Sequence, residues 1–307
     1  MANKKKTKVA QKPQEKQQEK QPVNEKYKDR IFKSLFGNPE HKDWTLALYN
    51  AVNNSHYTNP NDIQFNTIDD ALFVGLQNDV SFIFMFELNL WEHQSTFDPN
   101  MPVRFLRHYA QVLEKHIVLS HYNPFSTKLQ RLPRPRFVCF YNGTKKQPEQ
   151  VTLKLSDAFG ISSEESDIEV KVTMININYG KNQKLLDACK PLKEYAWLVE
   201  TIRQHQKEKN NLEVAIDLTI DEMSKDFVIR NFIIGNRAEV KKMLLTEWNE
   251  QEMLQRDRDE VRMDERQRIA VDMLKSKRFS RADIVQFSKL SEDVVDSIEK
   301  SLALGLA

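Results

Sequence analysis

Polar side chains at the end of the most apolar run of the sequence are the first candidates for chemistry. The run NDVSFIFMFELNLWEHQST spans 78–96, has Asp79 at its start, and reaches Glu92, His93 and Gln94 near its end. Residues two apart in a strand share a face, so we expect Glu92 and Gln94 on one face and His93 on the other. Burying such groups costs free energy unless they are paired or bind a ligand.

A hairpin between 79–85 and 88–94 would place Asp79 beside Glu92 and Gln94. Two carboxylates, a main-chain carbonyl and water form an oxygen ligand set that suits a hard divalent cation such as Mg²⁺. A cation there could activate water and stabilise a phosphoryl transition state. In the competing structural interpretation, Asp79 caps a turn and Glu92 forms an ion pair. Spacing alone favours the structural interpretation, because two acids about one strand apart are common.

Helical periodicity surrounds this run. Apolar residues recur at helical spacing in 27–36, which Gly37 closes as a C-cap, and in 43–52, for which Asp43 is a candidate N-cap. After a Pro-rich break, the pattern predicts a long amphipathic helix over about 102–121.

Further strands are predicted beyond that helix. Residues 136–143 form a buried strand ending in an Asn-Gly turn, and 149–155 and 168–179 are rich in β-branched residues. Mixed strands and helices up to about residue 180 favour one α/β domain, and from Asn182 onward the pattern is helical.

Charge is distributed unevenly along the chain. The whole sequence has 46 basic and 44 acidic residues and a net charge of +2. Residues 1–26 hold eight lysines and three glutamates, a net charge of +5, so the remainder carries −3. We expect this Lys/Gln/Glu-rich tail to be disordered, and any nucleic-acid contact to come from a local basic patch of the folded part. Neither a secretory signal nor a membrane-spanning run is visible, and Cys139 and Cys189 have apolar neighbours typical of reduced core cysteines, so we expect a cytoplasmic protein.

The strand pair and its flanking segments resemble a known family, the PD-(D/E)XK nuclease-family transposases, also called recombination-promoting nucleases. That family has an Asp opening one strand and Glu-x-Lys or Glu-x-Gln on the next, positions held here by Asp79, Glu92 and Gln94. The resemblance covers roughly residues 27–250. It includes the following segments: DPNMPVRFLRHYAQVLEK, KDRIFKSLFG, LALYNAV, RFVCFYNG, LSDAFG, NINYG and LLDACKPLKEYA.

The resemblance implies an α/β fold with a PD-(D/E)XK restriction-endonuclease-like core, a four-stranded mixed sheet flanked by helices, and a helical C-terminal region. It also implies cleavage of DNA phosphodiesters with Mg²⁺ or Mn²⁺. Asp79, Glu92 and the main-chain carbonyl of His93 would be the metal ligands. Gln94 departs from the superfamily's lysine: it can orient water or phosphate but supplies no positive charge and accepts no proton. The general base is therefore left open.

Asp29 matches an N-terminal acid of the family, and Lys33 follows it by one helical turn. An ordinary early-helix acid stabilised by the helix dipole is an equal alternative for Asp29. We expect the His93 side chain to pack beneath a helix, away from the site.

DNA binding requires cationic contacts to phosphates. The segment STKLQRLPRPRF is Pro-broken, and its cations have no acidic neighbours in the sequence. The expected DNA-contacting residues are Lys128, Arg131 and Arg134, with Arg104 and Arg107 as second choices; Arg136 is set aside as an anchor of the following strand.

The predicted organisation is a basic tail (1–26), a nuclease-like core (27–180), a helical extension (181–250) and a C-terminal segment (251–307). The leading hypothesis is a magnesium-dependent DNA endonuclease linked to recombination or a mobile element, with a homodimer as one arrangement. A non-catalytic DNA-binding module is the first alternative, because FSRADIVQFSKLSEDVVDSIEK resembles a helix-turn-helix. Its last helix begins without base-reading Arg, Asn or Gln, which favours a small packed helical unit. A regulatory interaction protein with a degenerate site is the second alternative.

Overall fold

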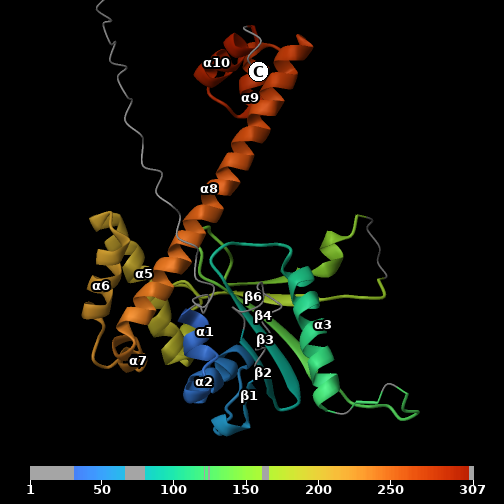
Figure 1. Cartoon of the computed structure of the whole chain (residues 1–307), viewed down its shortest axis with the longest axis vertical. Coiled ribbons are helices and arrows are strands. Elements are labelled where there is room, and N and C mark those ends of the chain that lie inside the picture. The colour runs from blue at the N-terminus through green and yellow to red at the C-terminus, as the bar shows by residue number, and fades with distance from the viewer. Residues whose placement is uncertain (1–30, 66–79, 121, 124, 161–165, 304–307) are drawn as a thin grey trace, which may run out of the picture.

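One mixed sheet forms the centre of the protein. The computed structural model describes residues 31–65, 80–120, 122–123, 125–160 and 166–303. Within these ranges, six strands form a single sheet in the order β1–β2–β3–β4–β6–β5, with helices on both faces (Figure 1). The mixed α/β architecture with a helical C-terminal region is thus confirmed, and the sheet has six strands where four were expected.

Parallel pairing in the middle of the sheet sets the position of the candidate site. β3 pairs in parallel with β4 and β4 with β6, while the β1–β2, β2–β3 and β5–β6 pairs are antiparallel. The carboxyl ends of β3, β4 and β6 therefore lie at the same edge of the sheet. The strands are β1 (Gln64–Phe65), β2 (Val80–Phe84), β3 (Glu87–Gln94), β4 (Arg134–Tyr141), β5 (Gln150–Lys154) and β6 (Lys171–Asn176).

The β2–β3 hairpin has an unexpected turn. Its two connecting residues, Met85 and Phe86, have φ of 48° and 61°, the left-handed region that a type I′ hairpin turn requires. Asn-Gly is the usual pair at these positions, and bulky side chains rarely adopt such φ values. The sequence placed the turn later, within Phe86–Asn89, because no turn residue marks its true position.

The helices begin and end where the sequence supplies suitable residues. Pro102 lies in the first turn of α3, where the missing N–H costs nothing. Asp43 is not the N-cap of α2 as predicted: the helix begins at Lys42, so Asp43 lies in its first turn. The N-cap is His41, whose side chain makes no capping bond. Gly37 follows α1, and a Cβ there would lie 2.9 Å from the main-chain oxygen of Lys33 and 3.2 Å from Val80, so close packing explains the glycine. The helices are α1 (Ile31–Phe36), α2 (Lys42–Asn53), α3 (Met101–Leu119), α4 (Gln183–Ala188), α5 (Lys190–Lys209), α6 (Leu212–Glu222), α7 (Arg230–Gly235), α8 (Arg237–Ser276), α9 (Arg281–Ser288) and α10 (Glu292–Ala303), with short 3₁₀ turns at Pro39–His41, Pro60–Asp62 and Leu155–Ala158.

Two hydrophobic clusters cover the two faces of the sheet. On one face, α3 packs through Met101 and Phe105 against Leu88 and Leu90 of β3. On the other face, one continuous cluster joins α1, α2 and β2 to α4, α5, α6 and the first turns of α8. The helices of the expected extension at 181–250 therefore pack on the same core as the sheet. Both cysteines are buried, and they form no disulfide bond.

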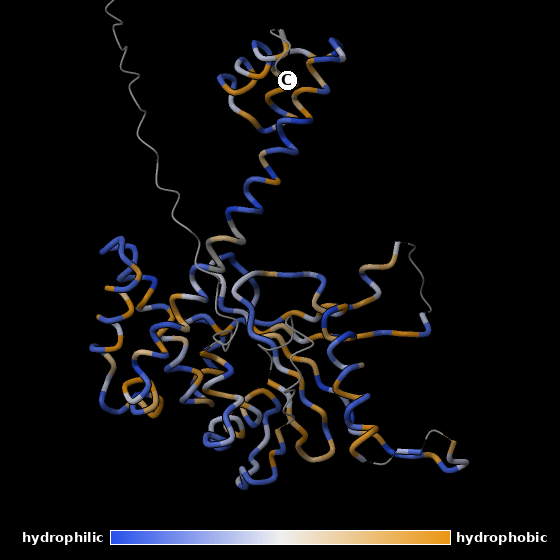
Figure 2. Tube along the Cα trace, viewed as in Figure 1, coloured by the Kyte–Doolittle hydropathy of each residue, from blue (hydrophilic) through white to orange (hydrophobic). Residues whose placement is uncertain are grey.

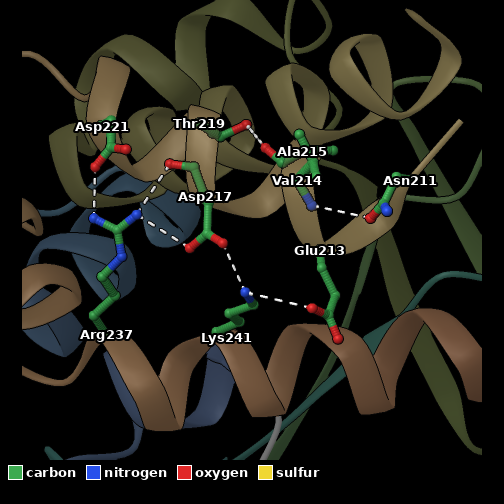
Figure 3. Close-up of polar contacts among 9 residues, drawn as sticks. All are labelled: Asn211, Glu213, Val214, Ala215, Asp217, Thr219, Asp221, Arg237 and Lys241. Carbon is green, nitrogen blue, oxygen red and sulfur yellow. Dashed lines mark hydrogen bonds and ion pairs between the residues drawn. The ribbon is translucent and has the colours of Figure 1, made fainter. Parts of the chain in front are cut away.

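The root of α8 is fixed to α6 by a network of ion pairs (Figure 3). Arg237 lies 3.1 Å from Asp217 and 2.5 Å from Asp221, and Lys241 lies 2.6 Å from Asp217 and 3.7 Å from Glu213. Hydrogen bonds from Lys241 and Arg237 hold the pKa of Asp217 below its usual value. Single surface pairs contribute little, but a network of shared partners gives α8 a defined direction at its root.

Beyond that root, α8 leaves the sheet domain and carries a small helical unit at its end (Figure 1). The middle of α8 is hydrophilic (Figure 2). At the tip, Ala270 of α8, Ile284 of α9 and Val295 of α10 belong to a separate hydrophobic cluster. Ser280 and Asp283 form a capping box at the start of α9. No helix in the described ranges combines the length and apolarity needed to cross a membrane.

Candidate functional site at the carboxyl end of β3

Glu92 and Gln94 lie together at the carboxyl end of β3, as the alternation of the strand predicts. Gln94 Nε2 lies 3.4 Å from Glu92 Oε2, on the face of the sheet that α3 covers. Their neighbours on β4 are Cys139 and Tyr141, both buried on the same face. The site therefore lies on an inner strand, which pairs with β4 as far as Gln94 and with β2 as far as Trp91.

The carboxylate of Glu92 is paired with a cation from α3. Its exposed fraction is 1%, and its Oε2 lies 3.0 Å from the guanidinium of Arg104. Arg104 also lies 3.7 Å from Asp98. A buried carboxylate needs such a partner, because removing a charge from water costs several kcal/mol. The ion pair expected for Glu92 under the structural interpretation is therefore present, and Arg104, a second choice for DNA contact, lies at the candidate site itself.

The other acids of the expected ligand set, Asp79 and Asp29, lie outside the described residues. Val80, which follows Asp79 in the sequence, is paired with Trp91, the residue before Glu92. In the part of the chain that the structure describes, no group of three or more His, Cys, Asp and Glu side chains is arranged to hold a metal ion. Glu92 and Gln94 supply one carboxylate and one amide oxygen. These donors suit Mg²⁺, but they form an incomplete ligand set without a further acid.

His93 points to the opposite face, as predicted, and takes part in a buried polar cluster. Its ring stacks on Phe32 of α1 with 5.1 Å between centroids. Its Nε2 lies 3.0 Å from the hydroxyl of Tyr195 on α5, and its Nδ1 lies 3.5 Å from the carboxylate of Glu247 on α8. The residue between Glu92 and Gln94 thus connects β3 to three helices.

The cations expected to contact DNA fall into two groups. Lys128 and Arg131 are exposed in the loop after α3, and Arg107 is exposed on α3. Arg134, by contrast, forms an ion pair with Glu87 at the start of β3. The prediction that the loop cations lack acidic partners is therefore wrong for Arg134, because strand pairing brings a carboxylate 47 residues away beside it.

Glu87 is a buried acid that sequence reasoning missed. It accepts hydrogen bonds from Tyr49 Oη at 2.8 Å and Arg136 Nε at 3.2 Å, in addition to Arg134. Burial raises the pKa of Glu87, but the hydrogen bonds from Arg134, Tyr49 and Arg136 outweigh burial and hold it below the usual value. Burial and the adjacent Glu87 raise the pKa of Tyr49. This cluster lies at the amino end of β3, so it fixes the strand at the end opposite to Glu92.

Polar residues in the segments that follow β4 and β6 form a second group without a predicted role. Arg203 of α5 donates to the main-chain oxygen of Asn142, which follows β4, and to Asn178 Oδ1 at 2.9 Å. Asn178 in turn donates to the main-chain oxygen of Gly143 at 3.0 Å. The signal in the sequence was an Asn within two residues of the end of each of two buried strands, since loops at the carboxyl ends of parallel strands commonly form ligand sites.

A short turn joins α9, which ends at Ser288, to α10, which begins at Glu292, and Lys289 of this turn is in the left-handed region at φ 56°. However, α10 begins with Glu292 and Asp293, and Asp296 and Glu299 pair with Arg281 of α9. An acidic helix repels phosphates. The structure therefore agrees with a small packed unit better than with a base-reading helix.

Comparison of the chain with protein-family models, with curated proteins and with solved structures found no significant match.

Proposed function

We propose that this protein is a metal-dependent DNA endonuclease that hydrolyses phosphodiester bonds. The observation that carries the proposal is the placement of Glu92 and Gln94 together at the carboxyl end of the central strand β3, with Arg104 3.0 Å from the carboxylate. Oxygen donors beside a cation can hold a divalent metal and balance the negative charge of a phosphate. The segment order that resembles the PD-(D/E)XK nucleases supports the same conclusion.

In this proposal, Glu92, Asp79 and the main-chain carbonyl of His93 bind Mg²⁺ or Mn²⁺, with Asp29 as an additional acid. The bound metal would supply Lewis-acid stabilisation of the phosphoryl transition state. Gln94 orients the attacking water or a phosphate oxygen through its amide, which can both donate and accept.

Arg104 has two roles in the same proposal. Its guanidinium pairs with Glu92 in the free protein. With DNA bound, it donates hydrogen bonds to the phosphate that is being cleaved, which guanidinium geometry suits. The proposal assigns no side chain as the general base. A substrate phosphate or bulk water accepts the proton of the attacking water.

The proposal also includes the location, the substrate and the oligomeric state of the protein. The protein acts in the cytoplasm on DNA, in recombination or for a mobile element, as a monomer or a homodimer. The exposed Lys128 and Arg131, together with Arg107, supply phosphate contacts away from the cleaved bond.

The decisive experiment is plasmid cleavage with Mg²⁺, with Mn²⁺ and with EDTA. Glu92→Gln keeps the size of the side chain and a hydrogen-bond partner for Arg104 but weakens metal binding, so we expect cleavage to fall at least about 100-fold. Glu114→Gln, at an exposed position of α3, is the matched control and should cut like the wild type. Undiminished Mg²⁺-dependent cutting by a folded Glu92→Gln protein would contradict the proposed site.

A further inference from the structure

A pocket lies at the carboxyl ends of β4 and β6, outside the expected DNA-contacting loop. We call it the β4–β6 pocket. It is lined by the loop 143–147 after β4, by residues between 176 and 181 after β6, and by the face of α5 between Glu200 and Lys207. Crevices at the carboxyl ends of parallel strands are where α/β proteins most often bind ligands.

The lining of the β4–β6 pocket is strongly cationic. Only one carboxylate, that of Glu200, is among the lining side chains. The cations come from all three segments: Lys145, Lys146, Lys181, Arg203 and Lys207. Because the chain outside the N-terminal tail has a net charge of −3, such a local excess of positive charge is not a general property of its surface. An excess of positive charge of this kind attracts anions.

Hydrogen bonds fix the walls of the pocket before any ligand binds. The Arg203 side chain, 13% exposed, joins the segment after β4 to the segment after β6 through Asn142 and Asn178. Tyr141 Oη donates to the main-chain oxygen of Lys145 at 2.8 Å, which holds the loop against the strand. Burial lowers the pKa of Arg203, but a guanidinium stays protonated at neutral pH. A preformed cationic pocket loses less conformational entropy on binding than mobile lysines would.

The same pocket is in direct contact with the chain that follows the candidate site. The main-chain N–H of Asn142 donates to the main-chain oxygen of Gln94 at 3.1 Å. A Cβ on Gly143 would lie 1.9 Å from the main-chain oxygen of Ser95, so only glycine allows this close approach. The loop 143–147 is therefore packed against the residues that follow Glu92 and Gln94.

We propose that the β4–β6 pocket binds a phosphate group, and that this phosphate belongs to the DNA backbone next to the bond that is cut. The choice of DNA as the source rests on the proposed nuclease function. Lysine ammonium groups bind phosphate as point charges, which suits a phosphodiester whose neighbours vary. The pocket would thereby set the register of the DNA strand at Glu92.

The test compares two double variants of the full chain that each remove two positive charges. The pocket variant is Lys145→Gln/Lys181→Gln. The control is Lys154→Gln/Lys171→Gln, at two exposed positions paired across β5 and β6. All four lysines are exposed, so both variants should retain the melting temperature of the wild type.

Two measurements are made on each protein. The first is binding of a labelled duplex in Ca²⁺, which should support binding without turnover, across a salt series. The second is the shift in melting temperature caused by pyrophosphate. We expect the pocket variant to bind the duplex about tenfold more weakly, with a salt slope shallower by about 0.9 for each phosphate that is no longer neutralised, while the control matches the wild type.

The outcomes separate the sources of the phosphate. Weaker duplex binding by the pocket variant alone supports the DNA backbone as the ligand. Unchanged duplex binding with loss of the pyrophosphate shift in the pocket variant alone supports a phosphate site for a free anion and overturns the DNA assignment. If the pocket variant matches the control in both measurements, the proposal is overturned.

The nuclease proposal and the pocket proposal are tested by different measurements, cleavage and binding. A protein that binds DNA through the pocket but does not cut it in Mg²⁺ would contradict the nuclease proposal and leave the pocket assignment intact. A protein that cuts DNA, loses cutting in Glu92→Gln and binds DNA equally well in the pocket and control variants would show the reverse.

Discussion

The guanidinium of Arg104 on α3 lies 3.0 Å from the carboxylate of Glu92 on β3, across the face of the sheet that α3 covers. This pair joins the only charged side chain on that face of β3 to the helix above it. The ion pair contributes only modestly to stability because Arg104 is 41% exposed, although Glu92 is buried. The pair links the stability of the fold to the chemistry of the candidate site, and it leads to the first prediction.

Arg104→Gln should destabilise the protein by about 1–3 kcal/mol, because the buried carboxylate of Glu92 is left with weaker compensation. The same change removes a positive charge beside the proposed metal, so Mg²⁺ should stabilise the variant more than it stabilises the wild type. Urea unfolding with and without Mg²⁺ measures both effects. Arg107→Gln, exposed on the same helix, is the control and should change neither quantity. Equal effects of the two substitutions would show that the Arg104 pair contributes nothing specific.

The second prediction concerns Gln94. Replacement by Lys should keep the cleavage rate within about tenfold of the wild type, because an ammonium can still donate to Glu92 and restores the superfamily pattern. Replacement by Leu should lower the cleavage rate by about 10–100-fold, as for loss of a residue that orients a metal ligand. Cleavage rates of both variants at saturating Mg²⁺ provide the measurement. Equal losses in the two variants would mean that Gln94 has a structural role only.

The third prediction separates the cations of the loop after α3. Lys128→Gln/Arg131→Gln should weaken duplex binding and reduce the salt slope by about 0.9 for each phosphate that the loop no longer neutralises, because both side chains are exposed on a folded surface. Arg134→Gln should instead lower the free energy of unfolding, since Glu87 loses a partner.

Deletion of residues 1–26 is the comparison for the loop variants. At physiological salt the Debye length is about 8 Å, so a diffuse tail charge should matter little. The salt series in Ca²⁺ decides between the tail and the loop. A larger loss of slope from the tail deletion than from the loop variant would show that the loop is not the DNA-contacting surface.

The fourth prediction follows from the depressed pKa of Glu87. Its folded-state pKa lies below its unfolded value, so its contribution to stability is present above the unfolded pKa of about 4.3 and is lost as the pH falls through the folded pKa. Glu87→Gln removes this dependence. The stability difference between the wild type and Glu87→Gln should therefore shrink as the pH falls from 6 towards 3.5 in urea unfolding. Glu114→Gln, exposed on α3, serves as the control, and a difference that stays constant with pH would contradict the assignment.

Local patterns in the sequence predicted the elements well. The alternation of β3 placed Glu92 and Gln94 on one face and His93 on the other, because strand geometry alone sets that arrangement. The turn at Met85 and Phe86 was missed, since neither residue is a turn former and the hairpin imposes their positive φ.

Side-chain contacts between residues far apart in the chain could not be predicted from such local patterns. Arg134 meets Glu87 through the register of β3 and β4, and Arg203 meets Asn178 through the packing of α5 on the strand ends. Such contacts depend on tertiary geometry, which periodicity does not encode. Basic residues in a loop therefore gave an incomplete prediction of the cationic surface. The β4–β6 pocket could be recognised only from the tertiary structure.

The last prediction concerns the buried contact between His93 and Glu247. His93 lies between the two candidate site residues of β3, and Glu247 lies on α8 near its root, 3.5 Å from the imidazole. Glu247→Leu should destabilise the protein by about 1–3 kcal/mol and lower the cleavage rate with little change in DNA affinity, because the backbone that carries Glu92 and Gln94 loses a support. Glu247→Gln keeps an amide oxygen for the imidazole and should recover most of the rate.

Glu239→Leu, at an exposed position in the first turn of α8, controls for an apolar substitution on this helix and should have no effect. Hydrogen exchange of the amides of residues 91–94 provides a readout independent of activity. We expect faster exchange in Glu247→Leu than in Glu247→Gln or the control, because α8 no longer holds that part of β3. Exchange and cleavage rates that match the wild type in Glu247→Leu would show that the position of β3 does not depend on α8.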